Sequence, residues 1–236
     1  MACSCKLLFG KRVAGLPARL KPRFLSGLPE SDLNAALSAA THRHFLAKSV
    51  VLHHGDPADR IFLLTSGIGR HFVLPGDGRK VILYWLTAGQ VFGGMTLLSE
   101  SQDYLASTEL LSDGCALVWD KKTIREIVSR HPILLDNALS IAATESFAWL
   151  MGAYVSLCSE DATKRVAHML VSLACGIGKK VPGGIEIPVV NEDLANGANV
   201  TPFTVSRALT AWQREGVLTK GRGKVFLRKP ELLLTA

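Results

Sequence analysis

The chain has 236 residues, of which 48% are hydrophobic, and it carries a formal net charge of +7 with an isoelectric point near 9.3. This composition excludes a disordered chain and allows two domains, each with its own core. The excess of basic residues favours a polyanionic partner. No uninterrupted run of about 18 apolar residues occurs, and the N-terminal residues lack the apolar core of a signal peptide. We therefore expect a cytoplasmic protein with no membrane span.

The first part of the chain predicts an arm followed by a β-rich domain. Residues 1–23 are basic and interrupted by glycine and proline, which indicates a flexible arm. Residues 24–130 open with a short helix capped by Ser31. Short strand-like runs follow at a spacing of about ten residues, which indicates an antiparallel barrel or sandwich. Pro75–Gly78 is the clearest hairpin signal. The runs are 44–52, 61–65, 70–74, 81–86, 91–92, 103–111 and 115–119.

Helices come next, and one of them is long. A short amphipathic helix is predicted over Lys121–Arg130, and Pro132 begins a helix that runs to about Cys158. Apolar residues in it repeat at the spacing of a coiled-coil seam, so residues 131–159 predict a dimerisation helix. The seam consists of Leu134, Ile141, Ala148, Met151, Val155 and Cys158.

Two alternatives remain for this long helix. A neighbouring stripe could pack on the protein's own barrel, or the helix could be a single core helix with no partner helix. The stripe consists of Phe147, Leu150, Tyr154 and Leu157.

Residues 160–236 predict a winged helix-turn-helix. A helix over 162–174 and a loop over 176–184 lead to a short helix capped by Asn191. The turn at Gly197–Asn199 tolerates left-handed backbone, and Thr201 and Pro202 form an N-cap with proline at the first helical position. The second helix buries a stripe at helical spacing and leaves the other face of its N-terminal half free for a major groove. The stripe is Val205, Ala208, Leu209 and Trp212.

Two short apolar runs then flank a basic, glycine-rich turn, which predicts the hairpin of a wing. In the second helix, Arg207 is expected to bind guanine, and Phe203 either touches a thymine methyl group or packs against the first helix or the turn. The hydroxyl groups and the basic wing residues are expected to bind phosphates. The predicted DNA-binding residues are Thr201, Phe203, Thr204, Ser206, Arg207, Lys220, Arg222 and Lys224.

In this order of elements the chain resembles the Crp/Fnr family of bacterial transcription regulators. The resemblance covers about Leu25 to Leu232 and is carried by three segments: Gly55–Gly67, Gly89–Gly94 and Asp193–Leu218. It implies an α+β fold in which a jelly-roll-like β-roll senses a signal, a long helix dimerises, and the winged helix-turn-helix binds a palindromic operator.

The resemblance also implies an effector pocket, and this chain departs from it. Where members that bind cyclic AMP have Glu, this chain has Gly94; where they have Arg-Ser, it has Tyr104 and Leu105. A buried phosphate without donors or a cation costs several kcal/mol, so cyclic AMP is not expected unless another basic residue reaches the pocket. Candidates for that are Arg70, Arg79 and Lys80. The pocket residues implied are Gly93, Gly94, Tyr104, Leu105 and Ala106.

An iron–sulfur sensor is the second option that the resemblance implies. Cys115 matches the β-roll cysteine of that branch, and Cys3 and Cys5 lie in the N-terminal arm. Such clusters need four thiolates, and only three are well placed. Cys115 also fits a plain core position, and the five scattered cysteines of the chain fit reduced thiols. Haem bound by one of the scattered histidines at positions 42, 44, 53, 54 and 71 is favoured less.

The sequence therefore predicts a dimeric, sequence-specific DNA-binding regulator with an effector other than cyclic AMP. No nucleophile elbow, P-loop or metal-ligand spacing indicates an enzyme. The alternatives are a redox or metal sensor that uses the cysteines, and a ligand-binding or protein-interaction module with degenerate DNA binding. RNA polymerase is a further possible partner.

Overall fold

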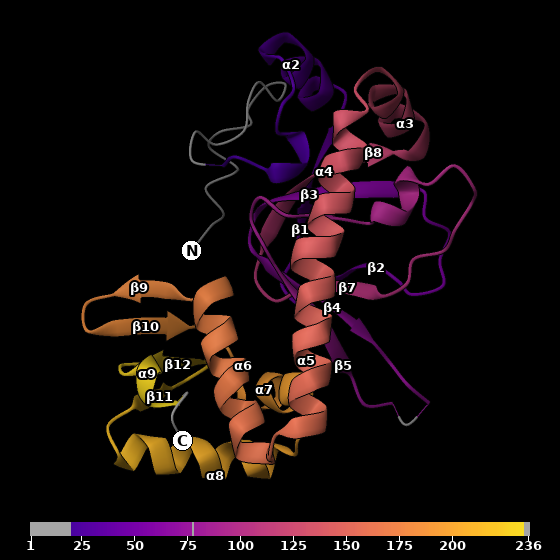
Figure 1. Cartoon of the computed structure of the whole chain (residues 1–236). Coiled ribbons are helices and arrows are strands. Elements are labelled where there is room, and N and C mark those ends of the chain that lie inside the picture. Colours follow the sequence, from indigo (N-terminus) through magenta and orange to yellow (C-terminus); the bar gives the residue numbers. More distant parts are fainter. Residues whose placement is uncertain (1–19, 77, 234–236) are drawn as a thin grey trace. The chain divides into compact units, whose positions relative to one another are not determined.

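The computed structural model describes residues 20–76 and 78–233 (Figure 1). It divides into two compact units. The first comprises Leu86–Ala148 and the described residues up to Phe72, and the second comprises Val73–Trp85 and the chain from Trp149 on. The predicted arm over residues 1–19, with Cys3 and Cys5, lies outside the described residues. Arg23, which we also expected in the arm, instead begins the 3₁₀ turn η1 (Arg23–Leu25).

Two four-stranded antiparallel sheets form the predicted β-roll. One has the order β1-β8-β3-β6 and the other the order β2-β7-β4-β5. The strands of the first are β1 (Thr41–Phe45), β8 (Gly114–Asp120), β3 (Arg60–Ser66) and β6 (Val91–Phe92). Those of the second are β2 (Val50–Leu52), β7 (Ser107–Leu110), β4 (Ile68–Val73) and β5 (Val81–Thr87).

Two boundaries differ from the prediction. The strand expected over 44–52 is two strands, because Lys48 between them has a φ of 64° and its amide donates to the Leu110 carbonyl over 2.6 Å. The first helix, α2 (Glu30–Ser38), begins after Pro29, so Ser31 lies inside the helix and does not cap it. Both errors are local, since turn residues fix such boundaries more finely than hydrophobic periodicity does.

The core of the first unit lies between β3, β8 and the helices around them. The indole of Trp119 is almost fully buried and donates to the Ala36 carbonyl over 2.8 Å, which ties β8 to α2. Helix α3 (Lys121–Arg130) begins at Asp120, whose side chain accepts from the Thr123 amide. The other large buried members of this core are Phe24, Leu37, Ile61, Leu63, Leu117, Ile124, Val128 and Leu134.

The long helix is built from α4 (Ile133–Ile141), a π-helical turn (Ala142–Phe147) and α5 (Ala148–Ser159). Leu134 is fully buried in the core, and Ile141 packs against the same core. We had predicted that these two residues belong to a free dimer seam, and that prediction is wrong for both of them. One face of α4 packs on its own unit, where η1 and α4 lie against each other.

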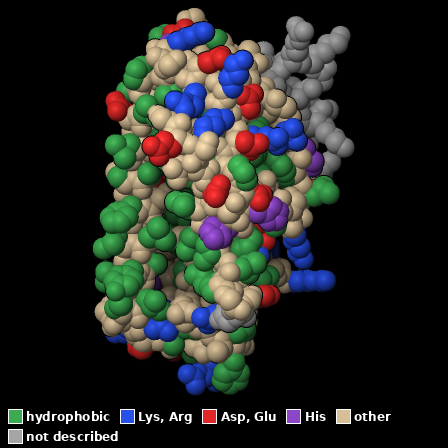
Figure 2. All heavy atoms as spheres, turned by 90° about the vertical axis from the view of Figure 1, so that its right-hand side faces the viewer, with side chains coloured by type: hydrophobic (Ala, Val, Ile, Leu, Met, Phe, Trp, Pro, Cys, Tyr) green, Lys and Arg blue, Asp and Glu red, His purple; other side chains and the backbone are tan. Residues whose placement is uncertain are grey.

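Away from this buried face the helix exposes large hydrophobic side chains. Figure 2 shows hydrophobic side chains down its left-hand margin, where this helix runs. The stripe that we considered as packing on the protein's own barrel is made of exposed side chains. The exposed residues are Leu135, Leu139, Phe147, Leu150, Met151, Tyr154, Val155 and Leu157.

The same helix, Ile133–Ser159, is the one helix in the described part of the chain that is long and apolar enough to cross a membrane. Our expectation of no span rested on the absence of an uninterrupted apolar run. The helix contains Asp136 and Glu145, and Glu145 binds the Arg23 guanidinium and the Gln90 amide. A carboxylate held by partners from the protein favours a protein environment over lipid.

The second unit contains the predicted winged helix-turn-helix. It consists of α6 (Ala162–Gly176), β9 (Lys179–Val181), β10 (Gly184–Ile187), α7 (Asn191–Ala198), α8 (Pro202–Arg214), β11 (Leu218–Gly221), β12 (Lys224–Leu227) and α9 (Pro230–Leu233). The sheet order is β11-β12-β10-β9. The loop expected over 176–184 is therefore wrong in part. Strand β9 escaped notice because its two lysines break the apolar alternation, whereas pairing with β10 holds it in the sheet.

A buried ion pair joins two strands of the β-roll. Arg70 of β4 lies directly opposite Glu109 of β7, and the guanidinium Nε donates to the carboxylate over 2.6 Å. The two side chains are 8% and 10% exposed. Because neither charge can recover hydration, each depends on the other.

Arg70→Met should therefore lower the free energy of unfolding by about 3–5 kcal/mol, since it leaves a buried carboxylate without its cation. The double variant Arg70→Met/Glu109→Leu should recover most of this loss, because two apolar side chains carry no desolvation penalty. Urea unfolding followed by circular dichroism measures both. A loss below about 1 kcal/mol in the single variant, as for an exposed pair, would contradict the prediction.

Candidate nucleic-acid interface

Helix α8 begins as its sequence predicts. The Thr201 hydroxyl accepts from the Thr204 amide over 3.2 Å, and Pro202 follows at the first helical position. The two threonine hydroxyls also lie 2.9 Å apart. Such a cap satisfies one free amide and fixes the direction in which the helix leaves the turn. Thr201 and Thr204 are thus engaged with each other at the exposed N-terminal end of α8.

The two faces of α8 are sharply different. The predicted stripe, Val205, Ala208, Leu209 and Trp212, is buried. On the opposite face Phe203 is 75% exposed and Arg207 is exposed. The alternative in which Phe203 packs on the first helix is therefore wrong. Within the described part of the chain the Arg207 guanidinium has no ion pair or hydrogen bond, so it is available to an external acceptor.

The turn before α8 uses different residues from those expected. Asn199 adopts the left-handed conformation with φ of 50°, whereas Gly197 is helical. A Cβ added at Gly197 would lie 2.9 Å from the Met169 methyl carbon, so this glycine allows α7 and α6 to approach closely. Helix α7 begins one residue earlier than predicted, with Val190 at the cap position and Asn191 as its first residue and not its cap.

The wing is tied to the recognition helix through Lys220. Its ammonium group donates to the Thr210 hydroxyl of α8 over 3.0 Å, and its backbone amide donates to the Gln213 side chain over 3.2 Å. Figure 1 shows α8 and the β11–β12 hairpin side by side. Lys220 therefore has a structural role in placing the wing, in addition to the phosphate contact that we predicted.

The other two basic wing residues differ from each other. The ammonium group of Lys224 lies 2.6 Å from a Glu186 carboxylate oxygen of β10, with both side chains partly exposed. Arg222 lies at the tip, between the two strands, and is exposed. Its side chain has no ion pair among the described residues. Arg222 is thus the wing cation that is most available for a phosphate.

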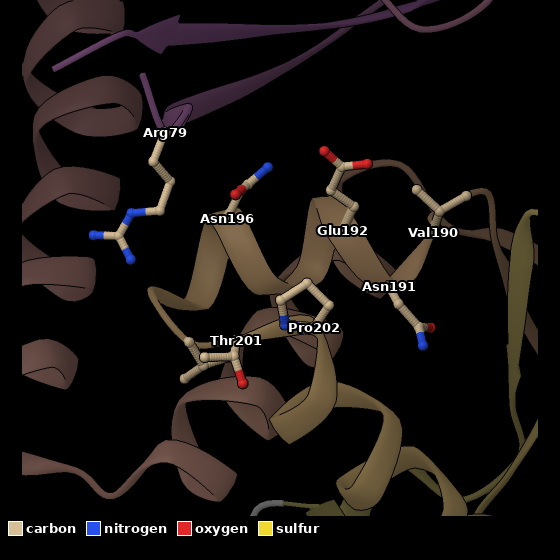
Figure 3. Close-up of a pocket in the computed structure, with 8 residues that line it drawn as sticks. Arg79, Val190, Asn191, Glu192, Asn196, Thr201 and Pro202 are labelled. Atoms are coloured by element: carbon tan, nitrogen blue, oxygen red, sulfur yellow. The ribbon is translucent and has the colours of Figure 1, made fainter. Parts of the chain in front are cut away.

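A cavity of about 650 Å³ lies beside the N-terminal ends of α7 and α8 (Figure 3). Figure 3 shows Asn196 and Glu192 on α7, Thr201 and Pro202 at the start of α8, and Arg79 on the segment before β5. The lining includes a guanidinium and two amides, but Glu192 adds a negative charge. This cavity includes Thr201, so it adjoins the surface that we predicted for DNA.

The turn expected to hold an effector is shaped by one glycine. Gly93 has φ of 79°, and a Cβ there would lie 2.7 Å from the Arg60 carbonyl oxygen. A Cβ at Gly94, where the resemblance implies a Glu, would meet nothing within 4 Å. Space alone therefore does not require glycine at position 94. Since a side chain would fit, the missing carboxylate is a chemical difference and not a steric one.

The other predicted pocket residues are arranged unevenly. The buried Tyr104 hydroxyl donates to the Arg60 carbonyl over 2.7 Å and accepts from the Arg60 amide over 3.0 Å. Burial raises the pKa of this hydroxyl above its ordinary value. Leu105 is 69% exposed and Ala106 is partly buried. The Tyr104 hydroxyl is therefore already hydrogen-bonded to the backbone of β3.

Comparison with known proteins matches both units. Residues 42–131 match the cyclic nucleotide-binding domain family, and residues 164–236 match the Crp-like helix-turn-helix domain family. The chain belongs to the Crp/Fnr family of transcription regulators.

Relatives and solved structures in this family align over most of the chain. The Cyclic AMP receptor protein of Thermus thermophilus is 29% identical and aligns over 88% of this chain and 93% of its own length. The Anaerobic regulatory protein of Bacillus subtilis is 26% identical over 88% of this chain and 89% of its own. FixK2 from Bradyrhizobium japonicum, at 21% identity, superposes with a TM-score of 0.72 over 83% of this chain and 96% of its own. This last likeness shows the fold.

The structure places two of the three basic residues of this Crp/Fnr protein that could have compensated for the missing Arg-Ser pair. Of the three basic residues that could have compensated, Arg70 is neutralised by Glu109 and Arg79 lines the cavity beside α7. His71, next to Arg70, donates or accepts at the Thr108 hydroxyl over 2.7 Å. Burial lowers the pKa of His71 to about 4, so it is neutral near pH 7. We therefore assign none of these residues to the binding of a cyclic nucleotide.

Of the three cysteines proposed for a cluster, Cys3 and Cys5 lie outside the described residues, and only Cys115 can be placed. Cys115 is fully buried, and its sulfur lies 3.5 Å from His44 Nδ1 across the β1–β8 pairing. Cys158 and Cys175 are exposed. Among the described residues no group of three or more His, Cys, Asp or Glu side chains could hold a metal. A buried thiol in a strand fits the plain core position that we kept as an alternative.

Sequence reasoning missed Arg165 of α6, which binds backbone carbonyls of the turn before α8. No local pattern marks it, since these carbonyls lie more than thirty residues away in sequence.

The neutral His71 makes stability depend on pH. Its pKa in the folded protein, about 4, lies below the ordinary value of 6.5, so the unfolded chain binds the extra proton first. The stability that this histidine contributes is complete above pH 6.5 and is lost as pH falls from 6.5 towards about 4.

His71→Asn should therefore flatten the loss of stability over this range, by up to about 1.4 kcal/mol per pH unit relative to the wild type. Urea unfolding of both proteins at several pH values gives the difference between their free energies of unfolding. Because the carboxylates are the same in both proteins, their contribution cancels in this difference. Parallel curves would contradict the assignment.

Proposed function

We propose that this Crp/Fnr regulator binds a palindromic DNA operator as a homodimer and responds to an effector other than cyclic AMP. The observation that carries the proposal is the outward face of α8, where Phe203 and Arg207 are exposed while the opposite face is buried. A helix that exposes an arginine and an aromatic ring in its N-terminal half suits the major groove.

Base reading is assigned to two residues. Arg207 can place two donors on guanine O6 and N7, which is the commonest specific contact. Phe203 can touch a thymine methyl group. Together they favour a half-site in which a G·C pair is kept beside a position that prefers thymine.

Phosphate binding is assigned to hydroxyl and basic groups around these two. Thr201, Thr204 and Ser206 lie in the first half of α8, and Lys220, Arg222 and Lys224 belong to the wing. Contacts of this kind set the register on the duplex and carry no sequence information themselves. The partners of Lys220 and Lys224 within the protein leave Arg222 as the main wing contact.

Dimerisation is assigned to the exposed face of the long helix. Phe147, Leu150, Met151, Tyr154 and Val155 are all exposed there, so α5 presents a continuous apolar surface to solvent. A row of large apolar side chains exposed on one helix marks an interaction surface. A second copy of the same helix buries it symmetrically and places two α8 helices for the two halves of a palindrome.

The remaining assignments follow from the family and the pocket. Known relatives of this chain are transcription regulators, and we propose that the protein acts in the cytoplasm without catalysis. RNA polymerase is the partner that activation of transcription would require. For the effector, the neutral histidine and the neutralised arginine favour a ligand without a phosphate. The experiment that tests the function is selection of bound duplexes from random DNA, and an absence of any enriched palindrome would contradict it.

Arg207→Ala should lose discrimination at one base pair of the selected site, by about 1–3 kcal/mol, because a bidentate contact to guanine is removed. Binding titrations on the selected duplex and on four single-base variants at that pair measure the loss. Affinity that falls equally on all the duplexes would contradict base reading by Arg207.

Arg222→Ala should instead weaken binding to every duplex to a similar extent. One phosphate contact fewer should lower the slope of log K against log salt by about 0.9. Titrations at several salt concentrations measure it. Arg130→Ala, which removes an exposed charge at the end of α3, is the matched control and should leave the slope unchanged.

A further inference from the structure

Three segments of the second unit meet at Arg165. This residue lies in the first turn of α6, directly after the end of the long helix. The Asp161 carboxylate caps α6 by accepting from the amides of Thr163 and Lys164 over 2.8 and 3.0 Å. This cap fixes the first turn of the helix, and so it fixes the position from which the Arg165 side chain extends.

The guanidinium of Arg165 binds three backbone carbonyls. Nη1 donates to the Glu160 carbonyl over 2.8 Å, Nε donates to the Ala198 carbonyl over 3.1 Å, and Nη2 approaches the Asn199 carbonyl at 3.4 Å. Glu160 follows the last residue of α5, whereas Ala198 and Asn199 form the end of α7. One side chain therefore connects the end of the long helix to the turn of the helix-turn-helix.

These carbonyls need a donor from elsewhere. The last carbonyls of a helix have no partner within it and carry the negative end of its dipole. The Val200 amide turns back to the Ala195 carbonyl over 3.0 Å, whereas the carbonyls of Ala198 and Asn199 accept from the Arg165 guanidinium. A cation with several N–H groups satisfies both carbonyls, and its charge is attracted to the negative end of the helix dipole.

Glu160 is held by its side chain as well as its backbone. One carboxylate oxygen lies 2.7 Å from His168 Nδ1, and the other accepts from the Ser156 hydroxyl. His168 belongs to α6 and Ser156 to α5, so the junction between the two helices is fixed from both sides. Arg165 extends this fixed junction to the turn that precedes Thr201.

We infer that Arg165 is a positioning residue for DNA reading: it holds the turn that caps α8 in a set place relative to the end of the long helix. The inference rests on the proposed function. Arg165 acts through α8 and not through a base or phosphate contact of its own. A lysine cannot replace it, because one ammonium group is a point donor, whereas the planar guanidinium reaches three carbonyls in fixed directions.

Three variants separate this role from a simple charge effect. Arg165→Lys keeps the charge and loses the fork, Arg165→Gln loses both, and Lys164→Gln removes the same charge from an exposed neighbour. Titrations use the duplex selected by the wild type and a random duplex, at several salt concentrations.

Both Arg165 variants should bind the selected duplex about ten-fold more weakly, a loss in the range for hydrogen bonds to a charged group. Arg165→Lys should keep the wild-type affinity for the random duplex and the wild-type salt slope. Lys164→Gln should weaken both duplexes to the same small extent.

Two results would overturn the inference. Wild-type selectivity in Arg165→Lys would show that charge alone matters, and equal behaviour of the Arg165 variants and Lys164→Gln would show that the turn does not depend on Arg165. If Arg165→Gln does not fold, Arg165→Lys alone decides between these results.

A second measurement does not depend on DNA. Hydrogen exchange of the segment 195–203 should be faster in Arg165→Lys than in the wild type, at an unchanged unfolding temperature. Unchanged exchange would overturn the inference. If the wild type enriches no duplex, the proposed function fails, and hydrogen exchange still decides whether Arg165 holds the turn.

Discussion

The burial of one side of α8 is the constraint on which the reading surface depends. Val205, Ala208, Leu209 and Trp212 are each almost fully withdrawn from water, and together they fix the rotation of the helix about its axis. Once that rotation is set, residues on the other side have no freedom to turn inward. Phe203 and Arg207 are exposed because the hydrophobic effect buries the residues on the opposite side of the helix. The surface that we propose for DNA reading is therefore the side of α8 that the core leaves uncovered.

The elements around α8 convert this rotation into a defined placement. Thr201 caps the helix, Gly197 lets α7 and α6 approach closely, and Lys220 fastens the wing to the recognition helix. Arg165 adds a connection to the end of the long helix. Most of these contacts use backbone groups or a side chain with a single partner, so each is weak alone. Their combined effect is geometric, because several independent contacts restrict the turn and the wing to one arrangement relative to α8.

The β-roll shows how one fold can keep its frame while its interior chemistry changes. The strands, the glycine turn at Gly93 and the core around Trp119 form this frame, and the interior carries a buried Arg70–Glu109 pair and a neutral His71. A charge that is already compensated inside the protein attracts an anionic ligand less than an unpaired charge does. Tyr104 is similar, because its hydroxyl is already bound to the backbone of Arg60. These internal partners are the basis of our proposal that the effector is not cyclic AMP.

Sequence alone determined the elements whose cause is local. The period of the α8 stripe, the Thr201–Pro202 cap and the turn residues between strands depend on neighbours a few positions away, so each could be predicted. Tertiary structure decided what depends on distant partners. It placed Leu134 in a core and not in a seam, left Phe147 and Tyr154 exposed, and paired β9 with β10 despite its lysines. It also brought Arg165 to carbonyls at 198 and 199, and Arg70 to Glu109. Such partners are chosen by chain topology, and hydrophobic periodicity carries no record of which distant residue a side chain will meet.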